Sequence, residues 1–482
     1  MAKSIKKNFI LNIILTISSM IFPLITMPYV TGILFDVGMG KVSFALSFIS
    51  YFQLFAGLGI PTYGIRATAQ CRDDKEKLSK TSHELLIINL ITTAISYVAL
   101  AILILFIPKL REEKLLYVIM SATIFLSSIG MEWLYKGLEN YSYITIRLVI
   151  FKFLALVLTF LLIKSESDYV LYGMLSVFAA SASNILNLFY ARKYISFKWQ
   201  KNYNIKRHLK PVLVFFALSC ATTIYTHLDT TMLGFIVGDS AVGQYDVAIK
   251  LKNFLTILVT SLGAVLLPRV SYFVEKGEFE EFWKVNTKGI NFVFVLAVPL
   301  ILYFILFAKE SVFFISNETF ANAILPFQII LPVILFIGLT NVMGIQILVP
   351  LGKENIVLYS CIAGAVINLI LNSIFIPIYA EVGAAIGTLV AELVVLIYQY
   401  VVLRKEIKKA FLSVQYYKII IASALSFSSC LWISNLALDI FLTLLISACI
   451  FFAVYGATLL ILKEKFTYNL VKQLFEKLKK HK

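Results

Sequence analysis

The chain has 482 residues, of which 60% are hydrophobic and only 15% are charged, and its formal net charge is +16. This composition excludes an ordinary soluble enzyme and favours a protein with many membrane-spanning helices. The five cysteines and four histidines have no metal-ligand spacing, so the sequence predicts no metal site.

Apolar runs long enough to cross a bilayer as helices follow one another along the whole chain. The first, 9–34, is too long for the core of a secretory signal, so we expect an uncleaved membrane span. The sequence therefore predicts an all-α membrane protein with about 14 transmembrane helices. The later spans are expected at 42–65, 82–107, 115–135, 145–164, 169–191, 209–237, 244–268, 287–308, 324–349, 355–379, 383–403, 416–436 and 438–462.

Lysine and arginine residues are distributed unevenly between the two sets of connections. With the N-terminus inside, the cytoplasmic connections and tails hold 34 of them, and the outer connections hold six. This bias predicts a multi-pass protein of the cell membrane with both termini in the cytoplasm. Anionic lipid then accounts for the net charge, and no nucleic-acid partner is expected. The last stretch, 463–482, is expected to form a basic amphipathic helix on that surface.

Two weak internal repeats suggest how the spans are grouped. Residues 40–45, GKVSFA, match 243–248, GQYDVA, at an offset of 203 positions. At an offset of 212, DYV at 168–170 followed by RK at 192–193 matches AEV at 380–382 followed by RK at 404–405. Two nearly equal offsets favour two homologous six-helix lobes. We expect an N-terminal lobe at 1–192, a basic cytoplasmic connection at 193–210, a C-terminal lobe at 211–405, two extra spans within 406–462, and the tail.

Prolines interrupt the first two spans at Pro23, Pro28 and Pro61. A proline inside a membrane helix frees a carbonyl group and permits bending. Two interpretations stay open, namely a helix that bends during alternating access and a static packing kink.

Ionisable residues occur inside several spans, where they are costly and commonly face a protein interior or a water-filled path. Asp246 and Lys250 are four positions apart, so they share a helix face and can form an ion pair. Lys252 lies about 200° around the helix from Lys250 and points elsewhere. The alternative is that these lysines extend to the membrane interface or are neutralised by a neighbour.

Two acids inside spans are candidates for ion coupling. Asp229 and Glu392 could each take up H⁺ or help bind Na⁺, because burial raises the pKa of a carboxyl group. His227, two positions before Asp229, is a further candidate for ion coupling. The alternative is a buried, hydrogen-bonded acid that only holds helices together. Both coupling ions stay open, and no other cofactor is expected.

Several motifs resemble the bacterial polysaccharide-transporter family, from about residue 8 to about residue 405. They are FPLITMPYVTGIL, SFISYFQLFAGLGIPTYGIR, GMEWLYKGLENYSYITIR, THLDTTMLGF, AVGQYDVAIKLKN and GAVLLPRVSYF. That family includes flippases for O-antigen and capsule repeat units. It belongs to the superfamily of multidrug, oligosaccharidyl-lipid and polysaccharide exporters.

The resemblance implies two helical lobes around a V-shaped cationic cavity. It also implies an undecaprenyl-diphosphate-linked oligosaccharide, flipped from the inner to the outer leaflet by alternating access. A diphosphate that crosses the bilayer needs fixed positive groups in place of water. Lys250, Arg147 and Lys152 are the candidates, with Arg66 and Arg269 at the cytoplasmic mouth. Arg147 and Lys152 could instead extend to the interface, and Arg66 and Arg269 could serve only the charge bias.

The peptidoglycan-lipid branch of the superfamily has a cation in its eighth span, where Lys250 falls, but also an arginine in its first span. The run 9–34 has no arginine, which argues against a cell-wall precursor as substrate. The alternative function is an ion-coupled multidrug exporter on the same scaffold. No enzymatic activity is expected, because the connections are short and no phosphate-binding glycine loop is present. Membrane lipids are expected partners, and a polysaccharide polymerase complex is a further candidate.

Overall fold

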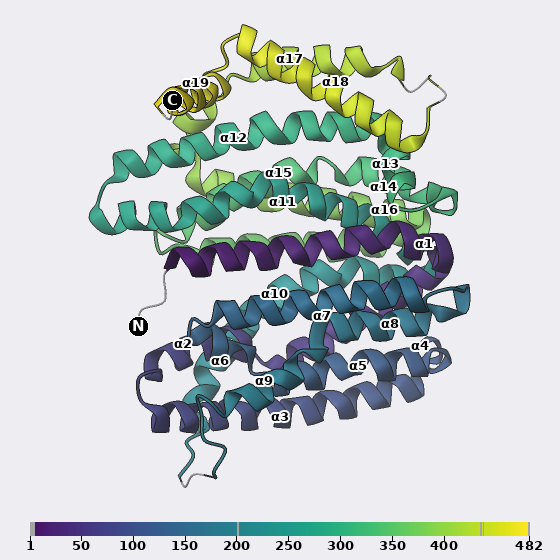
Figure 1. The fold of residues 1–482 in the computed structure, drawn as a ribbon, viewed down its shortest axis with the longest axis vertical. Helices are drawn as coiled ribbons and strands as arrows, with labels where there is room; N and C mark the ends of the chain where they lie inside the picture. The colour runs from purple at the N-terminus through teal and green to yellow at the C-terminus, as the bar shows by residue number, and fades with distance from the viewer. Residues whose placement is uncertain (1–4, 200–201, 434–435, 437, 481–482) are drawn as a thin grey trace. The chain divides into compact units, whose positions relative to one another are not determined.

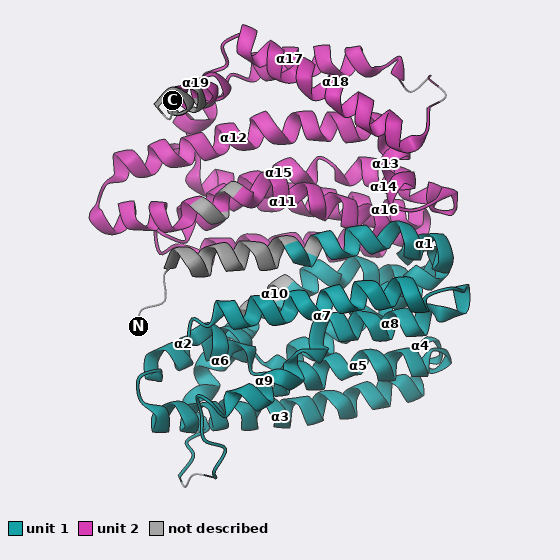
Figure 2. Cartoon of the chain, in the orientation of Figure 1, with its two compact units in different colours: residues 1–243 teal, residues 244–482 magenta. Residues whose placement is uncertain are grey.

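The computed structural model describes residues 5–199, 202–433, 436 and 438–480, and all regular structure in these residues is helical. Contacts divide the chain into two compact units, residues 1–243 and 244–482 (Figures 1 and 2). Helices are the expected solution for such an apolar chain, because a bilayer offers no partners for free backbone N–H and C=O groups.

Unit 1 contains the helices from α1 to α10 and the beginning of α11. Its α1 packs against α3, α5, α7 and α10. The helices are α1 (Ile5–Gly57), α2 (Ile60–Cys71), α3 (Lys75–Phe106), α4 (Pro108–Glu112), α5 (Lys114–Ile129), α6 (Glu132–Gly137), α7 (Tyr141–Leu162), α8 (Tyr169–Val177), α9 (Asn184–Ala191) and α10 (Lys206–Ile236), with a 3₁₀ turn at Glu166–Asp168 and a π-helical turn at Phe178–Ala182.

Unit 2 begins inside α11 (Asp239–Lys276) and contains the remaining helices. Here α17 and α18 form a hairpin that contacts α12, as Figure 1 shows. The remaining helices are α12 (Phe279–Leu306), α13 (Ala308–Ile315), α14 (Ile324–Ile330), α15 (Val333–Thr340), α16 (Glu354–Leu412), α17 (Tyr416–Cys430), α18 (Ile440–Ile461) and α19 (Lys465–Lys480), with a 3₁₀ turn at Glu318–Ala323 and a π-helical turn at Asn341–Leu348.

Two of the helices are far longer than a membrane is thick. α1 has 53 residues and α16 has 59, whereas roughly 20 residues cross the hydrocarbon core of a bilayer. Each contains one non-helical residue, Phe35 in α1 (φ 52°) and Ala380 in α16 (φ 50°). These breaks fall between the spans predicted at 9–34 and 42–65, and between those at 355–379 and 383–403.

Eight helices in the described residues are long and apolar enough to cross a membrane, and ten are if each of two bent helix pairs counts as one span. Because α1 and α16 are each counted once despite their breaks, this number does not test the predicted total of 14, which stays a prediction. The prediction of an all-α membrane protein is confirmed.

The division by contacts differs in position from the predicted lobe boundary. α10 packs against α1 and α2 and belongs to unit 1, whereas the internal repeat assigns it to a C-terminal lobe that starts at 211. Contacts report which helices pack together, whereas a sequence repeat reports which segments are related. The lobe boundary at 193–210 therefore stays a prediction.

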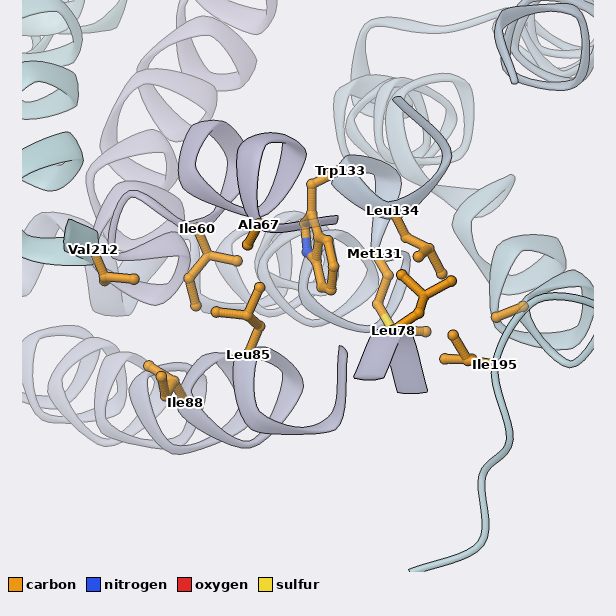
Figure 3. Close-up of a cluster of buried hydrophobic side chains, with 11 residues drawn as sticks. Ile60, Ala67, Leu78, Leu85, Ile88, Met131, Trp133, Leu134, Ile195 and Val212 are labelled. Atoms are coloured by element: carbon orange, nitrogen blue, oxygen red, sulfur yellow. The ribbon is translucent and has the colours of Figure 1, made fainter. Parts of the chain in front are cut away.

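One end of unit 1 is held together by an apolar core (Figure 3). Ile60 and Ala67 of α2 meet Leu85 of α3 and Trp133 of α6 in this core, and Val212 of α10 joins it. Next to it, Asp74 caps α3 by accepting hydrogen bonds from the backbone N–H groups of Lys77 and Glu76. The hydrogen bond from the Lys77 N–H group is the largest cause that holds the pKa of Asp74 below its usual value, and the bond from Glu76 adds to it. Core and cap together fix the end of α3 next to the 193–210 connection.

Candidate functional site

Lys250 and Asp246 form an ion pair on one face of α11. The Lys250 Nζ atom lies 2.6 Å from Asp246 Oδ2, one helical turn away, as the spacing predicts. The Lys250 side chain is 32% exposed and the Asp246 side chain is 16% exposed, so a ligand outside unit 2 can reach the Lys250 ammonium group. Lys252, only two positions further on, is buried. The two lysines therefore lie in different environments.

Lys152 lies in a cavity of unit 1 that measures about 210 Å³. Its Nζ atom donates a hydrogen bond to Ser19 Oγ over 2.5 Å. Pro23 lines the same cavity, together with polar residues and the π-helical turn. The lining residues are Ser19, Phe22, Pro23, Thr26, Lys152, Ala155, Leu156, Thr159, Tyr172, Leu175, Ser176, Ala179 and Ala180. None of these described lining residues is acidic, and π-helical turns often occur at functional sites.

Arg147, five positions before Lys152, is enclosed instead. Its side chain is 2% exposed. The Nη1 atom donates to Ser183 O over 3.3 Å and to Asn184 Oδ1 over 3.4 Å, and Nη2 lies 3.9 Å from Glu132 Oε2. A substrate could reach this guanidinium only after these contacts change, so its role as a phosphate ligand stays a prediction.

His227 and Pro61 line a second cavity of unit 1, about 280 Å³ in volume. The His227 Nδ1 atom lies 3.4 Å from Ser47 Oγ, and the His227 ring meets the Tyr51 ring edge-on at 6.4 Å. The lining residues are Ser50, Gln53, Leu54, Gly57, Gly59, Pro61, Ser219, Thr223 and His227. Hydroxyl and amide groups of this kind suit sugar hydroxyls.

The two candidate coupling acids are both buried, each in its own unit. Asp229 is 7% exposed in α10, and Glu392 is 8% exposed in α16. One turn before Glu392, the Thr388 hydroxyl lies 2.9 Å from the Tyr245 hydroxyl. Burial of a carboxyl group at membrane depth is compatible with ion coupling and with a structural role, so both interpretations stay open.

Three further predicted residues are exposed on their helices. Arg66 extends from α2, Arg269 from α11 with its guanidinium 5.5 Å from the Phe273 ring, and Pro28 lies within α1. Their predicted roles at the cytoplasmic mouth and in helix bending remain predictions.

Sequence reasoning did not single out a contact between the segments Asp36–Gly40 and Asp239–Gly243. A Cβ atom at Gly40 would lie 1.7 Å from Asp239 O, and one at Gly243 would lie 2.0 Å from Asp36 O. The Ser240 hydroxyl also donates to the Asp36 carboxylate. Both aspartate–glycine segments are related by the offset of 203 that marks the internal repeat, so the repeat was the available signal.

A buried polar cluster around Glu84 was also not predicted. The Glu84 side chain is fully buried and lies 2.5 Å from Arg207 Nη2 and 2.8 Å from His208 Nε2. Its Oε1 atom accepts a hydrogen bond from Asn204 N over 2.7 Å, and Tyr63 OH lies 2.8 Å from His208 Nδ1. The cluster fastens the end of the 193–210 connection to α3 and α2. Nothing in the sequence relates residues about 120 positions apart.

The described residues contain no group of three or more His, Cys, Asp or Glu side chains that could hold a metal ion. The candidate functional features are the accessible Lys250–Asp246 ion pair, the cavity that contains Lys152 and the polar cavity at His227.

A family model described as polysaccharide biosynthesis protein matches residues 5–274, which is more than half of the chain. The chain belongs to this family. A second model, MatE, matches residues 215–374. The resemblance drawn from the motifs is thereby confirmed.

Two relatives carry the name "Putative O-antigen transporter". The protein from Shigella dysenteriae is 26% identical over 370 residues, which is 76% of this chain and 91% of the relative. The protein from Escherichia coli (strain K12) is 22% identical over 370 residues, covering 76% of this chain and 89% of the relative. Each of these alignments is longer than the region that the family model matches.

Solved structures share the fold. The lipid II flippase MurJ in its inward closed conformation aligns with a TM-score of 0.74 and 17% identity, over 97% of this chain and 99% of that chain. A multidrug-resistance MATE transporter in its inward-facing conformation aligns with a TM-score of 0.63 and 15% identity, over 83% and 98%. The expected two-lobe fold class is confirmed, and these neighbours are transporters and flippases rather than enzymes.

Proposed function

We propose that the chain is a flippase that moves an undecaprenyl-diphosphate-linked oligosaccharide from the inner to the outer leaflet of the cell membrane. The observation that carries the proposal is the accessible Lys250–Asp246 pair inside an apolar helix. A fixed cation whose counter-ion lies on the same helix can exchange that carboxylate for a more highly charged phosphate group.

Other observations support the same function. Lys152 supplies a second cation at membrane depth, in a cavity without an acidic lining residue. The polar cavity at His227 supplies hydroxyl and amide groups near the break between α1 and α2. The two relatives named "Putative O-antigen transporter" support this substrate class.

Several features of the transport cycle belong to this proposal. Both termini are cytoplasmic, on the basis of the charge bias. Pro23, Pro28 and Pro61 permit bending of the first two spans, Arg66 and Arg269 attract the diphosphate to the cytoplasmic mouth, and Asp229 or Glu392 couples transport to H⁺ or Na⁺. Handover of the flipped product to a polysaccharide polymerase complex completes the pathway.

The alternative function is an ion-coupled multidrug exporter. The MatE match at 215–374 and the MATE structural neighbours favour it specifically. Cationic drugs would require acids in the accessible cavities, however, whereas the described residues that line the cavity at Lys152 and the cavity at His227 include none.

Deletion of the gene in its own host tests both functions. We expect an undecaprenyl-diphosphate repeat unit to accumulate in the inner leaflet, and its sugars to identify the substrate. Unchanged lipid-linked intermediates together with increased sensitivity to cationic drugs would instead establish the drug exporter.

A further inference from the structure

We propose that unit 2 has a separate site for the phosphate of an anionic phospholipid, located between the tail helix α19, the middle part of α12 and the end of α16. A cavity of about 310 Å³ lies there. It is lined by Lys288 and Asn291 of α12, by Ser413 directly after α16, and by Lys465, Phe466, Asn469 and Gln473 of α19. Of the seven described lining residues, two are cationic, four are neutral and polar, and none is acidic.

The first turn of α19 is firmly attached to the rest of unit 2, so one wall of this cavity is fixed. Glu464 is 1% exposed and caps the helix by accepting hydrogen bonds from Phe466 N over 3.0 Å and Thr467 N over 2.7 Å. The Phe466 ring meets the Phe292 ring of α12 edge-on, with 6.1 Å between the centroids. The cap also keeps the Glu464 charge engaged with backbone N–H groups.

The opposite wall is fixed by a bridge between α12 and the end of α16. Asn291 Nδ2 donates to Thr287 O over 2.8 Å and to Ser413 Oγ over 3.2 Å. Ser413 Oγ in turn donates to Ala410 O over 2.6 Å. The amide and hydroxyl groups are therefore oriented before any ligand arrives, which lowers the entropic cost of binding.

The position along the chain places the cavity at the level of lipid headgroups. Lys288 stands at the start of the predicted span 287–308, Ser413 precedes the span 416–436, and α19 follows the span 438–462. Three predicted membrane spans thus begin or end around one cavity, at the depth where phosphodiester groups of lipids are concentrated. A basic amphipathic helix at this level binds anionic leaflets through both its charges and its apolar face.

A phosphodiester suits these walls chemically. Its single negative charge can accept charge-assisted hydrogen bonds from Lys288 and Lys465, and its remaining oxygens and polar headgroup suit Asn469 and Gln473. We assign the phosphate to a membrane lipid rather than to free phosphate, because a basic amphipathic helix such as α19 is expected to lie at the membrane interface. The inference is independent of which substrate the protein flips.

Native mass spectrometry of the full-length protein in detergent, supplied with equal amounts of phosphatidylglycerol and phosphatidylethanolamine, tests this site. We expect preferential retention of phosphatidylglycerol. The double variant Lys288→Gln/Lys465→Gln should lower that retention about tenfold or more, because it removes two charge-assisted contacts. The matched control, Lys276→Gln/Lys405→Gln, changes net charge equally at exposed lysines outside the cavity and should retain the lipid.

A second variant keeps the test decisive if the double variant does not fold. Gln473→Glu adds one negative charge at an exposed lining residue and should also weaken retention of phosphatidylglycerol. Equal retention in the cavity variants and the control would overturn the site. Displacement of the lipid by millimolar inorganic phosphate, without preference between the two lipids, would overturn its assignment to a lipid.

Discussion

Gly40 lies against the carbonyl oxygen of Asp239, and Gly243 lies against the carbonyl oxygen of Asp36. A Cβ atom at Gly40 would be 1.7 Å from Asp239 O, and one at Gly243 would be 2.0 Å from Asp36 O. Only glycine permits this approach of two backbones. Because the same contact is made in both directions, it has the form of a two-fold symmetric interface within one polypeptide.

The first prediction concerns this contact. Gly40→Ala and Gly243→Ala should each destabilise the protein by about 1–3 kcal/mol, because backbone must move to admit the methyl group. Thermal unfolding in detergent measures the effect. Gly32→Ala is the matched control, since a Cβ atom there has no neighbour within 4 Å. Equal stability of all three variants would show that the close approach is not required.

The second prediction concerns the ion pair of α11. Lys250→Ala should abolish flipping and leave the Asp246 carboxylate without the cation that lies 2.6 Å away. Lys250→Arg should keep part of the activity because the charge survives. Lys252→Ala should have a milder effect, since that side chain is buried on another face. Full export of polysaccharide by Lys250→Ala, at normal protein level, would contradict a role in handling phosphate.

The third prediction concerns the buried acids. If Asp229 or Glu392 binds the driving ion, Asp229→Asn or Glu392→Gln should abolish gradient-dependent transport while substrate still binds. Transport into proteoliposomes with and without H⁺ and Na⁺ gradients measures this dependence. Glu354→Gln, at an exposed acid at the start of α16, is the control. Gradient-driven transport that persists in both amide variants would exclude these acids as the coupling groups.

The fourth prediction concerns orientation. In a background without the five native cysteines, Ser167→Cys should react with a membrane-impermeant maleimide on intact cells. Lys198→Cys should react only after the membrane is opened, because it lies in the connection predicted to be cytoplasmic. Both positions are exposed, so access does not limit labelling. Labelling of Lys198→Cys from outside would reverse the assigned topology.

The fifth prediction concerns the Glu84 cluster. Glu84→Gln should destabilise unit 1 by about 3–5 kcal/mol, because it removes the carboxylate shared by Arg207 and His208 at a fully buried position. The same change in an exposed pair, Glu281→Gln beside Lys284, should cost about 1 kcal/mol or less. Comparable unfolding temperatures for the two variants would mean that the cluster contributes no more than a surface pair.

The sequence predicted features that depend on local spacing. Apolar run lengths predicted the membrane helices, and the four-residue interval predicted the Lys250–Asp246 pair. The offset of 203 predicted that the segments starting at Gly40 and Gly243 are related. The first two features repeat or close within a few turns of helix, and the repeat is found by comparing one chain with itself, so a single sequence is enough to reveal all three.

Features built from distant residues could not be predicted in the same way. Glu84 and His208 are brought together by the packing of α3, α2 and α10, and no periodicity connects them. The enclosure of Arg147 by Ser183 and Asn184 depends on the path of the chain through its π-helical turn. Helix length alone likewise gave no sign that α1 and α16 continue through breaks of a single residue.

The reciprocal contact of Gly40 and Gly243 relates two halves of one chain, and this relation bears on how a cation can be present in one half only. In an assembly of two identical half-length chains, every side chain occurs twice, so a lysine at the position of Lys250 would have an unavoidable twin. Here the related position of the first half carries Ser47, whose hydroxyl faces His227. When two related halves are joined in one polypeptide, the reciprocal glycine contact is kept, and the two halves can differ in charge.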